Sequence, residues 1–263
     1  MPETTTPPAA PPLLAVGDVT VRFGGVVALD ELSFGIREGD ICGLIGPNGA
    51  GKTTCFNVVS RIYEPTSGRV TFDGQDLLRL PAHRIASVGI ARTFQNLALF
   101  PSMSLLENVM VGAHCRGSIG FVRAGLRLPP WGEEHETRVL AYDLLARLGL
   151  ADVAFRPAAG LPFGTLKRLE LARALAGRPR FLLLDEPASG LTHGEVDELG
   201  ETIKRVRDDF GLTVLLVEHH IALVMGISDH VVAMDFGRKI AEGSPYEVQR
   251  DPLVIEAYLG SPT

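Results

Sequence analysis

The nine residues "GPNGAGKTT" at positions 46–54 constrain the fold of this chain more than any other stretch. They match the pattern G-x-x-x-x-G-K-[ST], in which glycine lets the backbone curl until successive N–H groups face a phosphate. Within this pattern the lysine brings a positive charge to the β and γ phosphate oxygens, and the hydroxyl after it can ligate Mg²⁺. The residues that fill these positions are Gly46, Pro47, Asn48, Gly49, Ala50, Gly51, Lys52, Thr53 and Thr54.

The segments on either side of this loop are those that a nucleotide site requires. The apolar run "DICGLIG" precedes it and predicts a strand, and a helix is predicted from Lys52 to about Arg61. Strand, phosphate loop and helix in this order predict a nucleotide site at which Mg²⁺ can be bound.

Apolar strands alternate with amphipathic helices along the rest of the chain. Residues 13–45 form short β-like runs, and the strands "RFLLLDE" and "LTVLLVEH" enclose a helix with Thr192 and Glu195 at capping-box spacing. Such alternation is typical of an α/β fold with a mostly parallel sheet covered on both faces. The apolar stripe of the enclosed helix is expected to face the core and consists of Val196, Leu199, Ile203, Val206 and Phe210.

Helical periodicity replaces the β signals over about residues 97–165. The segments "SLLENVMVGAH" and "EEHETRVLAYDLLARLGL" are predicted helices, joined by a connection rich in Gly, Arg and Pro at 116–132. We therefore expect a single domain over 13–263, with 13–96 and 166–263 as its core and about 97–165 as a helical insertion. Residues 1–12 are predicted to be a disordered Pro-rich tail.

Composition argues against several functional classes. The formal net charge of −6 gives no support to a basic surface, so no nucleic-acid partner is expected. The apolar runs are far shorter than the 18 or more residues of a membrane helix. Cys42, Cys55 and Cys115 lack metal-like spacing and are interpreted as reduced thiols.

Two acids end the strand "FLLLDE". Asp185 is placed to hold Mg²⁺, usually through water, and Glu186 can polarise an attacking water as a general base. Taken alone, two acids could simply mark a strand end that meets solvent. Their occurrence together with a phosphate loop favours the catalytic interpretation.

Three other residues are open to two interpretations each. His219 could hydrogen-bond a γ-phosphate or be a surface residue at a strand end. Gln95 could contact water or metal, or could only end a strand. Phe23 could stack on an adenine or be an ordinary half-buried aromatic residue.

A glycine-containing turn precedes the strongly helical stretch "LKRLELARALAG". The amides at a helix start are unpaired and carry partial positive charge. The turn is therefore either a linker or half of a phosphate site, and it consists of Leu161, Pro162, Phe163, Gly164 and Thr165.

The succession of these motifs over about residues 13–260 resembles the ATP-binding cassette (ABC) family. The resemblance implies a RecA-like P-loop NTPase core with an N-terminal antiparallel β subdomain and an inserted helical subdomain. It implies that Phe23 stacks on adenine, that Gln95 lies in the Q-loop and contacts Mg²⁺, and that Asp185 and Glu186 are Walker B and the catalytic glutamate. His219 would be the switch histidine, residues 161–165 the signature loop, and Ser189, Gly190, Leu191 and Thr192 the D-loop.

Several stretches are similar to the ATPases of branched-chain amino acid importers, the LivG type, among them "ARTFQNLALFPSMSLLENVMVG" and the terminal "VIEAYLG". This resemblance implies an ATPase that pairs head to tail with a second cassette, most simply a different chain. It also implies transmembrane permease subunits, an indirect substrate-binding protein, and a cytoplasmic location on the inner face of the cell membrane. The alternatives are an exporter ATPase for a lipid or polysaccharide and a soluble assembly ATPase.

The chain departs from the family pattern at the signature loop and beyond. The usual L-S-G-G-Q is replaced by L-P-F-G-T, so the serine hydroxyl that would meet the γ-phosphate is absent at Pro162. Thr192 stands where the D-loop aspartate is usual, and His220 stands where an Asp often follows the switch histidine. Pro162 therefore leads to the hypothesis of two unequal ATP sites.

Overall fold

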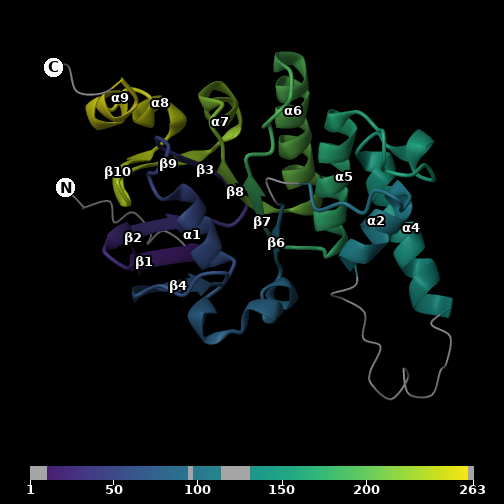
Figure 1. Cartoon of the computed structure of the whole chain (residues 1–263), viewed down its shortest axis with the longest axis horizontal. Helices are drawn as coiled ribbons and strands as arrows, with labels where there is room; N and C mark the ends of the chain where they lie inside the picture. The colour runs from purple at the N-terminus through teal and green to yellow at the C-terminus, as the bar shows by residue number, and fades with distance from the viewer. Residues whose placement is uncertain (1–10, 94–96, 114–130, 260–263) are drawn as a thin grey trace, which may run out of the picture.

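A six-stranded sheet forms the centre of the computed structural model, which describes residues 11–93, 97–113 and 131–259 (Figure 1). All neighbouring strands run parallel except β9 and β10, which are antiparallel. The strand order is β10 (Arg238–Gly243), β9 (His230–Asp235), β3 (Ile41–Ile45), β8 (Thr213–Val217), β7 (Phe181–Asp185) and β6 (Ile90–Arg92).

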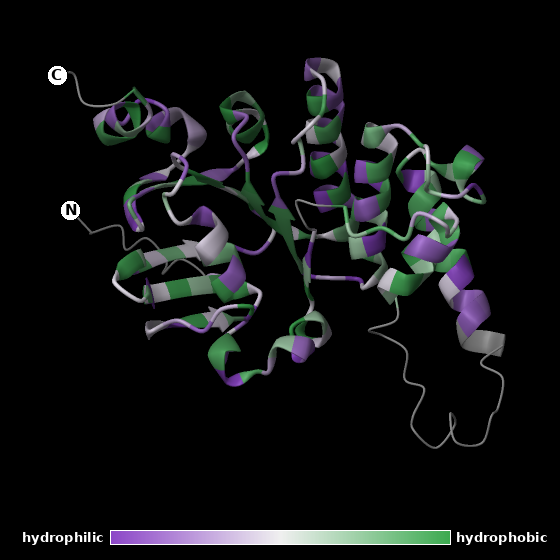
Figure 2. Ribbon diagram, viewed as in Figure 1, coloured by the Kyte–Doolittle hydropathy of each residue, from purple (hydrophilic) through white to green (hydrophobic). Residues whose placement is uncertain are grey.

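The central strands are apolar because both of their faces are covered. Every residue of β3, β7 and β8 is buried, and the middle of this sheet is almost uniformly hydrophobic in Figure 2. A continuous apolar run is what a parallel strand between two helical layers requires. The predicted mostly parallel α/β sheet is confirmed.

A second, antiparallel sheet lies beside the first. Its order is β2 (Val26–Ile36), β1 (Leu14–Phe23), β4 (Ser67–Phe72) and β5 (Gln75–Asp76). Helix α1 (Lys52–Val59) lies between the two sheets in Figure 1, and one apolar core joins Leu14, Phe56 and Leu183 from all three layers. The N-terminal antiparallel subdomain of the predicted fold is therefore present.

Further helices pack on one another at the far edge of the large sheet, beside β6 (Figure 1). They are α2 (Leu105–Gly112) and α4 (Trp131–Arg147) of the predicted insertion, the short η5 (Ala151–Val153), and α5 (Phe163–Ala176), which begins in the insertion and lies mostly in the predicted core range 166–263. A capping box of Ser104 and Glu107 begins α2. Three short 3₁₀ turns that the sequence patterns did not indicate precede β6, namely η1 (Leu77–Arg79), η2 (Ala82–Arg84) and η3 (Ala86–Val88).

Helix α6 follows its sequence prediction closely. Helix α6 (His193–Phe210) begins at the predicted Thr192 and Glu195 capping box, and its apolar stripe packs into the core with only Phe210 half-buried. The chain ends in α7 (Ile221–Ile227), α8 (Pro245–Val248) and α9 (Pro252–Leu259). Among the described helices there is none with the length and apolar character needed to cross a membrane.

Some predictions fall outside the described residues. These are Gln95, Cys115, most of the tail at 1–12 and most of the connection at 116–132. Cys42 and Cys55 are free and buried, as expected of reduced thiols in a core.

Candidate functional site

The phosphate loop leaves the sheet at β3 and enters α1 through a backbone path that only glycine accommodates. Gly46 has φ 155°, and a Cβ there would lie 2.2 Å from the carbonyl oxygen of Met234. Gly51, the residue that precedes α1, has φ 99°, and its Cβ would lie 2.5 Å from the carbonyl oxygen of Ala28. Close approach of backbone on both sides therefore requires glycine at both positions, as the predicted anion cradle does.

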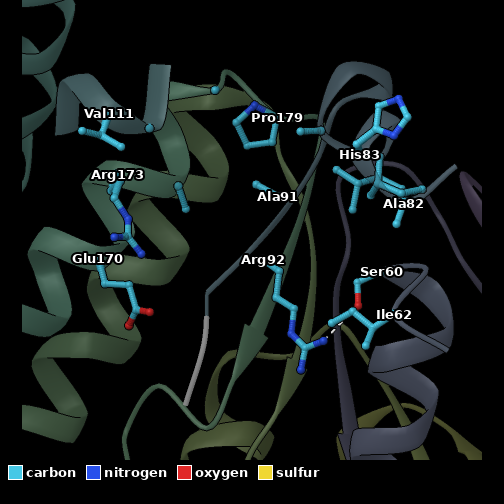
Figure 3. Close-up of a pocket in the computed structure, with 16 residues that line it drawn as sticks. Ser60, Ile62, Ala82, His83, Ala91, Arg92, Val111, Glu170, Arg173 and Pro179 are labelled. Carbon is cyan, nitrogen blue, oxygen red and sulfur yellow. Dashed lines mark hydrogen bonds between the residues drawn. The ribbon is translucent and has the colours of Figure 1, made fainter. Parts of the chain in front are cut away.

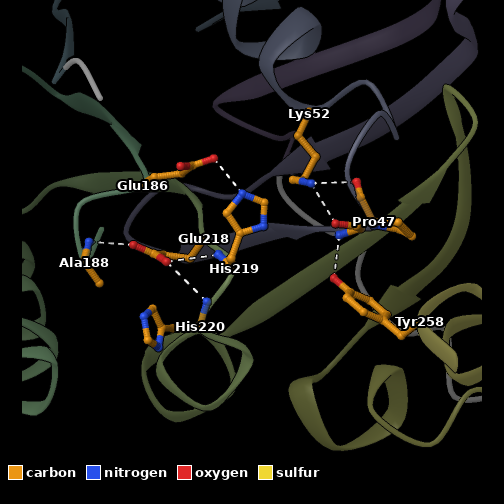
Figure 4. A network of polar contacts seen from close by, with 9 residues as sticks. Pro47, Lys52, Glu186, Ala188, Glu218, His219, His220 and Tyr258 are labelled. Atoms are coloured by element: carbon orange, nitrogen blue, oxygen red, sulfur yellow. Dashed lines mark hydrogen bonds and ion pairs between the residues drawn. The ribbon is translucent and has the colours of Figure 1, made fainter. Parts of the chain in front are cut away.

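Lys52 points back into its own loop (Figure 4). Its Nζ donates to the carbonyl oxygens of Gly46 at 2.6 Å and Pro47 at 2.9 Å. Burial lowers the pKa of the Lys52 ammonium group below its ordinary value, while the negative charge of Glu186 opposes that shift. The cation is thus held at the loop, beside the carboxylate of the candidate base.

The C-terminal helix also contacts the loop, through a residue for which the sequence patterns assigned no role. The Tyr258 hydroxyl of α9 accepts a 2.8 Å hydrogen bond from the buried N–H of Gly46. Burial raises the pKa of Tyr258, and the bond from Gly46 lowers it in part. The bond joins residues 212 positions apart in the chain, which local sequence patterns do not reveal.

Replacing Tyr258 with Phe is expected to lower the melting temperature by a few degrees. The substitution leaves a buried N–H without a partner, which lowers the free energy of unfolding by about 1–3 kcal/mol. In a protein of this size each kcal/mol lowers the melting temperature by about 2–4 °C. Calorimetry of the nucleotide-free chain measures this, with the exposed Tyr246→Phe as the matched control. Equal melting temperatures for the two variants would contradict the assigned bond.

The candidate base and the switch histidine are in direct contact. Nε2 of His219 lies 2.7 Å from Oε1 of Glu186, whose side chain is 15% exposed. Glu186 adopts a left-handed backbone with φ 48°, and its N–H donates to the carbonyl oxygen of Val217 at 2.9 Å. A non-glycine residue in the left-handed backbone region is strained, and such strain is common at active sites, where it helps to orient a functional side chain.

One cavity of about 270 Å³ collects these groups. Its lining joins the loop, the carboxylate and the imidazole with the start of β2, and consists of Asn48, Gly49, Ala50, Gly51, Lys52, Thr53, Thr54, Val26, Val27, Ala28, Glu186 and His219. Backbone amides and a lysine beside a carboxylate can bind a polyphosphate and take a proton from water at its terminal phosphorus.

Asp185 is held from the other side, by a residue that the sequence patterns did not single out. Its Oδ2 accepts from Nη2 of Arg92 at 2.7 Å, and both side chains are almost fully buried. Nη1 of the same arginine donates to Asn57 Oδ1 on α1 at 2.7 Å and to Oγ of Ser60, the C-cap of α1, at 2.9 Å. The carboxylate is therefore fixed next to the helix that the phosphate loop begins.

Phe23 does not line the cavity. Its side chain is 47% exposed, and its ring lies edge-on to Tyr63 with the centroids 5.2 Å apart. The ring of Phe23 is accessible to an aromatic ligand, and its stacking on adenine stays a prediction.

The expected turn at 161–165 is partly helix, because α5 already begins at Phe163 with Pro162 as its N-cap. The ring of Phe163 packs on the D-loop, since a Cβ at Gly190 would lie 3.0 Å from it. Lys167 Nζ lies 5.3 Å from the centroid of the same ring. Pro162, Gly164 and Thr165 line a second cavity of about 270 Å³, which shares no lining residue with the first.

Comparison with known proteins agrees with this geometry. Residues 29–189 match the family model described as ABC transporter, and residues 238–262 match the one described as branched-chain amino acid ATP-binding cassette transporter. The chain is 42% identical to the high-affinity branched-chain amino acid transport ATP-binding protein BraF of Pseudomonas aeruginosa, covering 95% of this chain and 98% of BraF. It is 43% identical to LivG of Salmonella typhimurium at the same coverage.

Solved structures show the same architecture. The ADP conformation of MJ1267, an ATP-binding cassette of an ABC transporter, superposes with a TM-score of 0.83 at 31% identity, covering 95% of this chain and 99% of that one. A nucleotide-free cassette gives a TM-score of 0.82 at 30% identity and equal coverage. With its phosphate loop, base and histidine gathered at one cavity, this chain belongs to the ABC transporter family and is an ATP-binding cassette with ATPase function.

Proposed function

We propose that this cassette is the energy-coupling ATPase of an importer for branched-chain or related amino acids. The observation that carries the ATPase part is the cavity where the phosphate loop meets Glu186 and His219. The substrate class rests on BraF and LivG, whose names describe branched-chain amino acid transport, and on the matching C-terminal segment.

In this proposal, backbone amides of the phosphate loop after Pro47 and the ammonium of Lys52 bind the β and γ phosphates. Glu186 accepts a proton from water while the water oxygen bonds to the γ-phosphorus and ADP leaves. His219 holds Glu186 through the 2.7 Å contact and faces the terminal phosphate.

The oxygen donors of the site fit Mg²⁺. Thr53 offers a hydroxyl in the cavity, and Asp185 offers a carboxylate at the end of β7. No cluster of three or more His, Cys, Asp or Glu that could hold a metal exists among the described residues, which suits an ion bound mainly through phosphates and water. Bound there, Mg²⁺ would neutralise charge on the β and γ phosphates.

We further propose a second cassette as partner, paired head to tail. The signature residues and the phosphate loop line separate cavities, so within one chain the start of α5 does not close over its own nucleotide site.

The permease is proposed to contact a groove between the core and the inserted helices. Its volume is about 730 Å³, and Figure 3 shows Val111, Glu170 and Arg173 on one side with Ile62 and His83 opposite. Docking there would hold the cassette peripherally on the inner face of the cell membrane.

Isolating the full chain from native membranes tests the assignment to an importer. Co-purification with two permease subunits, a second cassette and a periplasmic-type binding protein is expected. Recovery without membrane subunits would favour a soluble assembly ATPase, and recovery with exporter subunits for a lipid or polysaccharide would contradict import.

Restoring the signature serine is expected to strengthen the weaker ATP site. A serine hydroxyl bonded to a charged phosphate contributes about 1.5–3 kcal/mol, so Pro162→Ser should raise ATP hydrolysis by the assembled complex by roughly 10-fold. Pro162→Ala is the matched control, because it removes the ring without adding a hydroxyl. Unchanged ATPase and transport in Pro162→Ser would contradict two unequal sites.

A further inference from the structure

Glu218 is a buried carboxylate that the proposed chemistry does not use. It follows β8 directly, precedes His219, and is only 2% exposed. Such a group needs hydrogen-bond donors around it, because a carboxylate without partners in the interior is strongly destabilising.

Its donors come from two segments that both belong to the ATP site (Figure 4). Oε1 accepts from the N–H of Ala188 at 2.6 Å, two residues after Glu186. Oε2 accepts from the N–H of His219 at 2.9 Å and from that of His220 at 3.3 Å. One side chain therefore spans from the turn that carries the base to the turn that carries the histidine.

The turn after β7 needs such a restraint. Glu186 has φ 48°, a conformation that a non-glycine residue holds only when its surroundings fix it. The N–H of Glu186 is fixed to Val217, and the N–H of Ala188, on the other side of Pro187, is fixed to Glu218. Both acceptors lie on one continuous segment at the end of β8, and hydrogen bonds to a charged acceptor are the stronger kind.

We propose that Glu218 is a positioning residue for hydrolysis, which sets the distance between Glu186 and His219 by bonding the backbone of both turns at once. The inference rests on the proposed roles of Glu186 and His219. It also ties the histidine turn to the segment after Ala188, where Gly190 packs against the aromatic ring of Phe163.

Two substitutions test whether hydrolysis needs Glu218 to bond both turns, and one of them keeps the negative charge of the side chain. In Glu218→Gln one of the two oxygens becomes an amide nitrogen, which cannot accept, so one turn is released. Glu218→Asp keeps the charge but is shorter by one methylene, about 1.5 Å, so the carboxylate reaches His219 and not Ala188. Glu136→Gln, on the exposed face of α4, is the control.

The measurement is ATP hydrolysis by the full chain in the complex isolated with its membrane subunits. We expect kcat to fall about 10- to 100-fold in both variants, since each releases one of the two turns that the native carboxylate bonds. Affinity for Mg-ATP should stay within about twofold, because Lys52 and the loop amides are untouched. A kcat within twofold of the native value in either variant would overturn the proposal, as would a parallel loss of nucleotide affinity.

Combination with His219→Ala supplies a second readout. If Glu218 acts through His219 and Glu186, the double variant loses less activity than the product of the two single losses. A fully multiplicative loss would overturn the proposal. Glu186→Gln is measured alongside: undiminished hydrolysis there contradicts the assigned base, whereas its loss with an unaffected Glu218→Gln contradicts the positioning role alone.

Discussion

A cassette carrying Glu186→Gln is expected to bind Mg-ATP like the native chain and to hydrolyse it at least ~100-fold more slowly, the usual contribution of a general base. Glutamine keeps the size of the side chain and can still contact Nε2 of His219, 2.7 Å away in the native protein. It cannot accept the proton of the attacking water. Single-turnover hydrolysis and equilibrium nucleotide binding, measured on the same preparation, separate the two effects.

Glu136→Gln on α4 serves as the matched control for this variant, because it removes an exposed carboxylate away from the cavity. Undiminished hydrolysis by Glu186→Gln would remove Glu186 as the base. The strained φ of 48° would then need another explanation.

Replacing Lys52 with Ala is expected to abolish nucleotide binding itself, raising the dissociation constant of Mg-ATP by more than ~100-fold. In the proposed complex the ammonium group contacts phosphate oxygens through charge-assisted hydrogen bonds of about 1.5–3 kcal/mol each. Its removal also withdraws the bonds to Gly46 and Pro47 that shape the loop. Isothermal titration with Mg-ATP is the measurement.

Two comparisons make the Lys52 result specific. Lys204→Ala removes a cation from α6, where it pairs with Glu201, and should leave binding unchanged. The melting temperature of Lys52→Ala without nucleotide reports whether the loop has lost its fold. Native-like affinity in a folded Lys52→Ala chain would contradict the assignment of the phosphate site.

The fold was largely predictable because its signals are local. The all-buried strands β3, β7 and β8 appear in the sequence as apolar runs of strand length. The α6 capping box at Thr192 and Glu195 involves residues three apart. The 3₁₀ turns between β5 and β6 carry no such periodicity, so they were not indicated.

The boundary at the signature residues shows the limit of local signals. Proline and glycine at 162 and 164 suggested a turn, yet α5 starts at Phe163. Proline fits immediately before or at the first position of a helix because its missing N–H needs no partner there. Packing of Phe163 on Gly190 and of Gly164 against Glu195 then holds this first turn in place.

The sequence by itself determined the phosphate loop and the acids at the end of β7, because motif chemistry depends on neighbouring residues. Only the tertiary structure decided which distant groups touch them: Arg92 on Asp185, Tyr258 on Gly46, and Glu218 between Ala188 and His219. Each of these contacts except the bond from Glu218 to His219 crosses at least 30 positions of the chain. They form because buried polar groups need hydrogen-bond partners, and the packing of the strands decides which groups are near enough. A short-range sequence pattern does not indicate which distant residue becomes the partner.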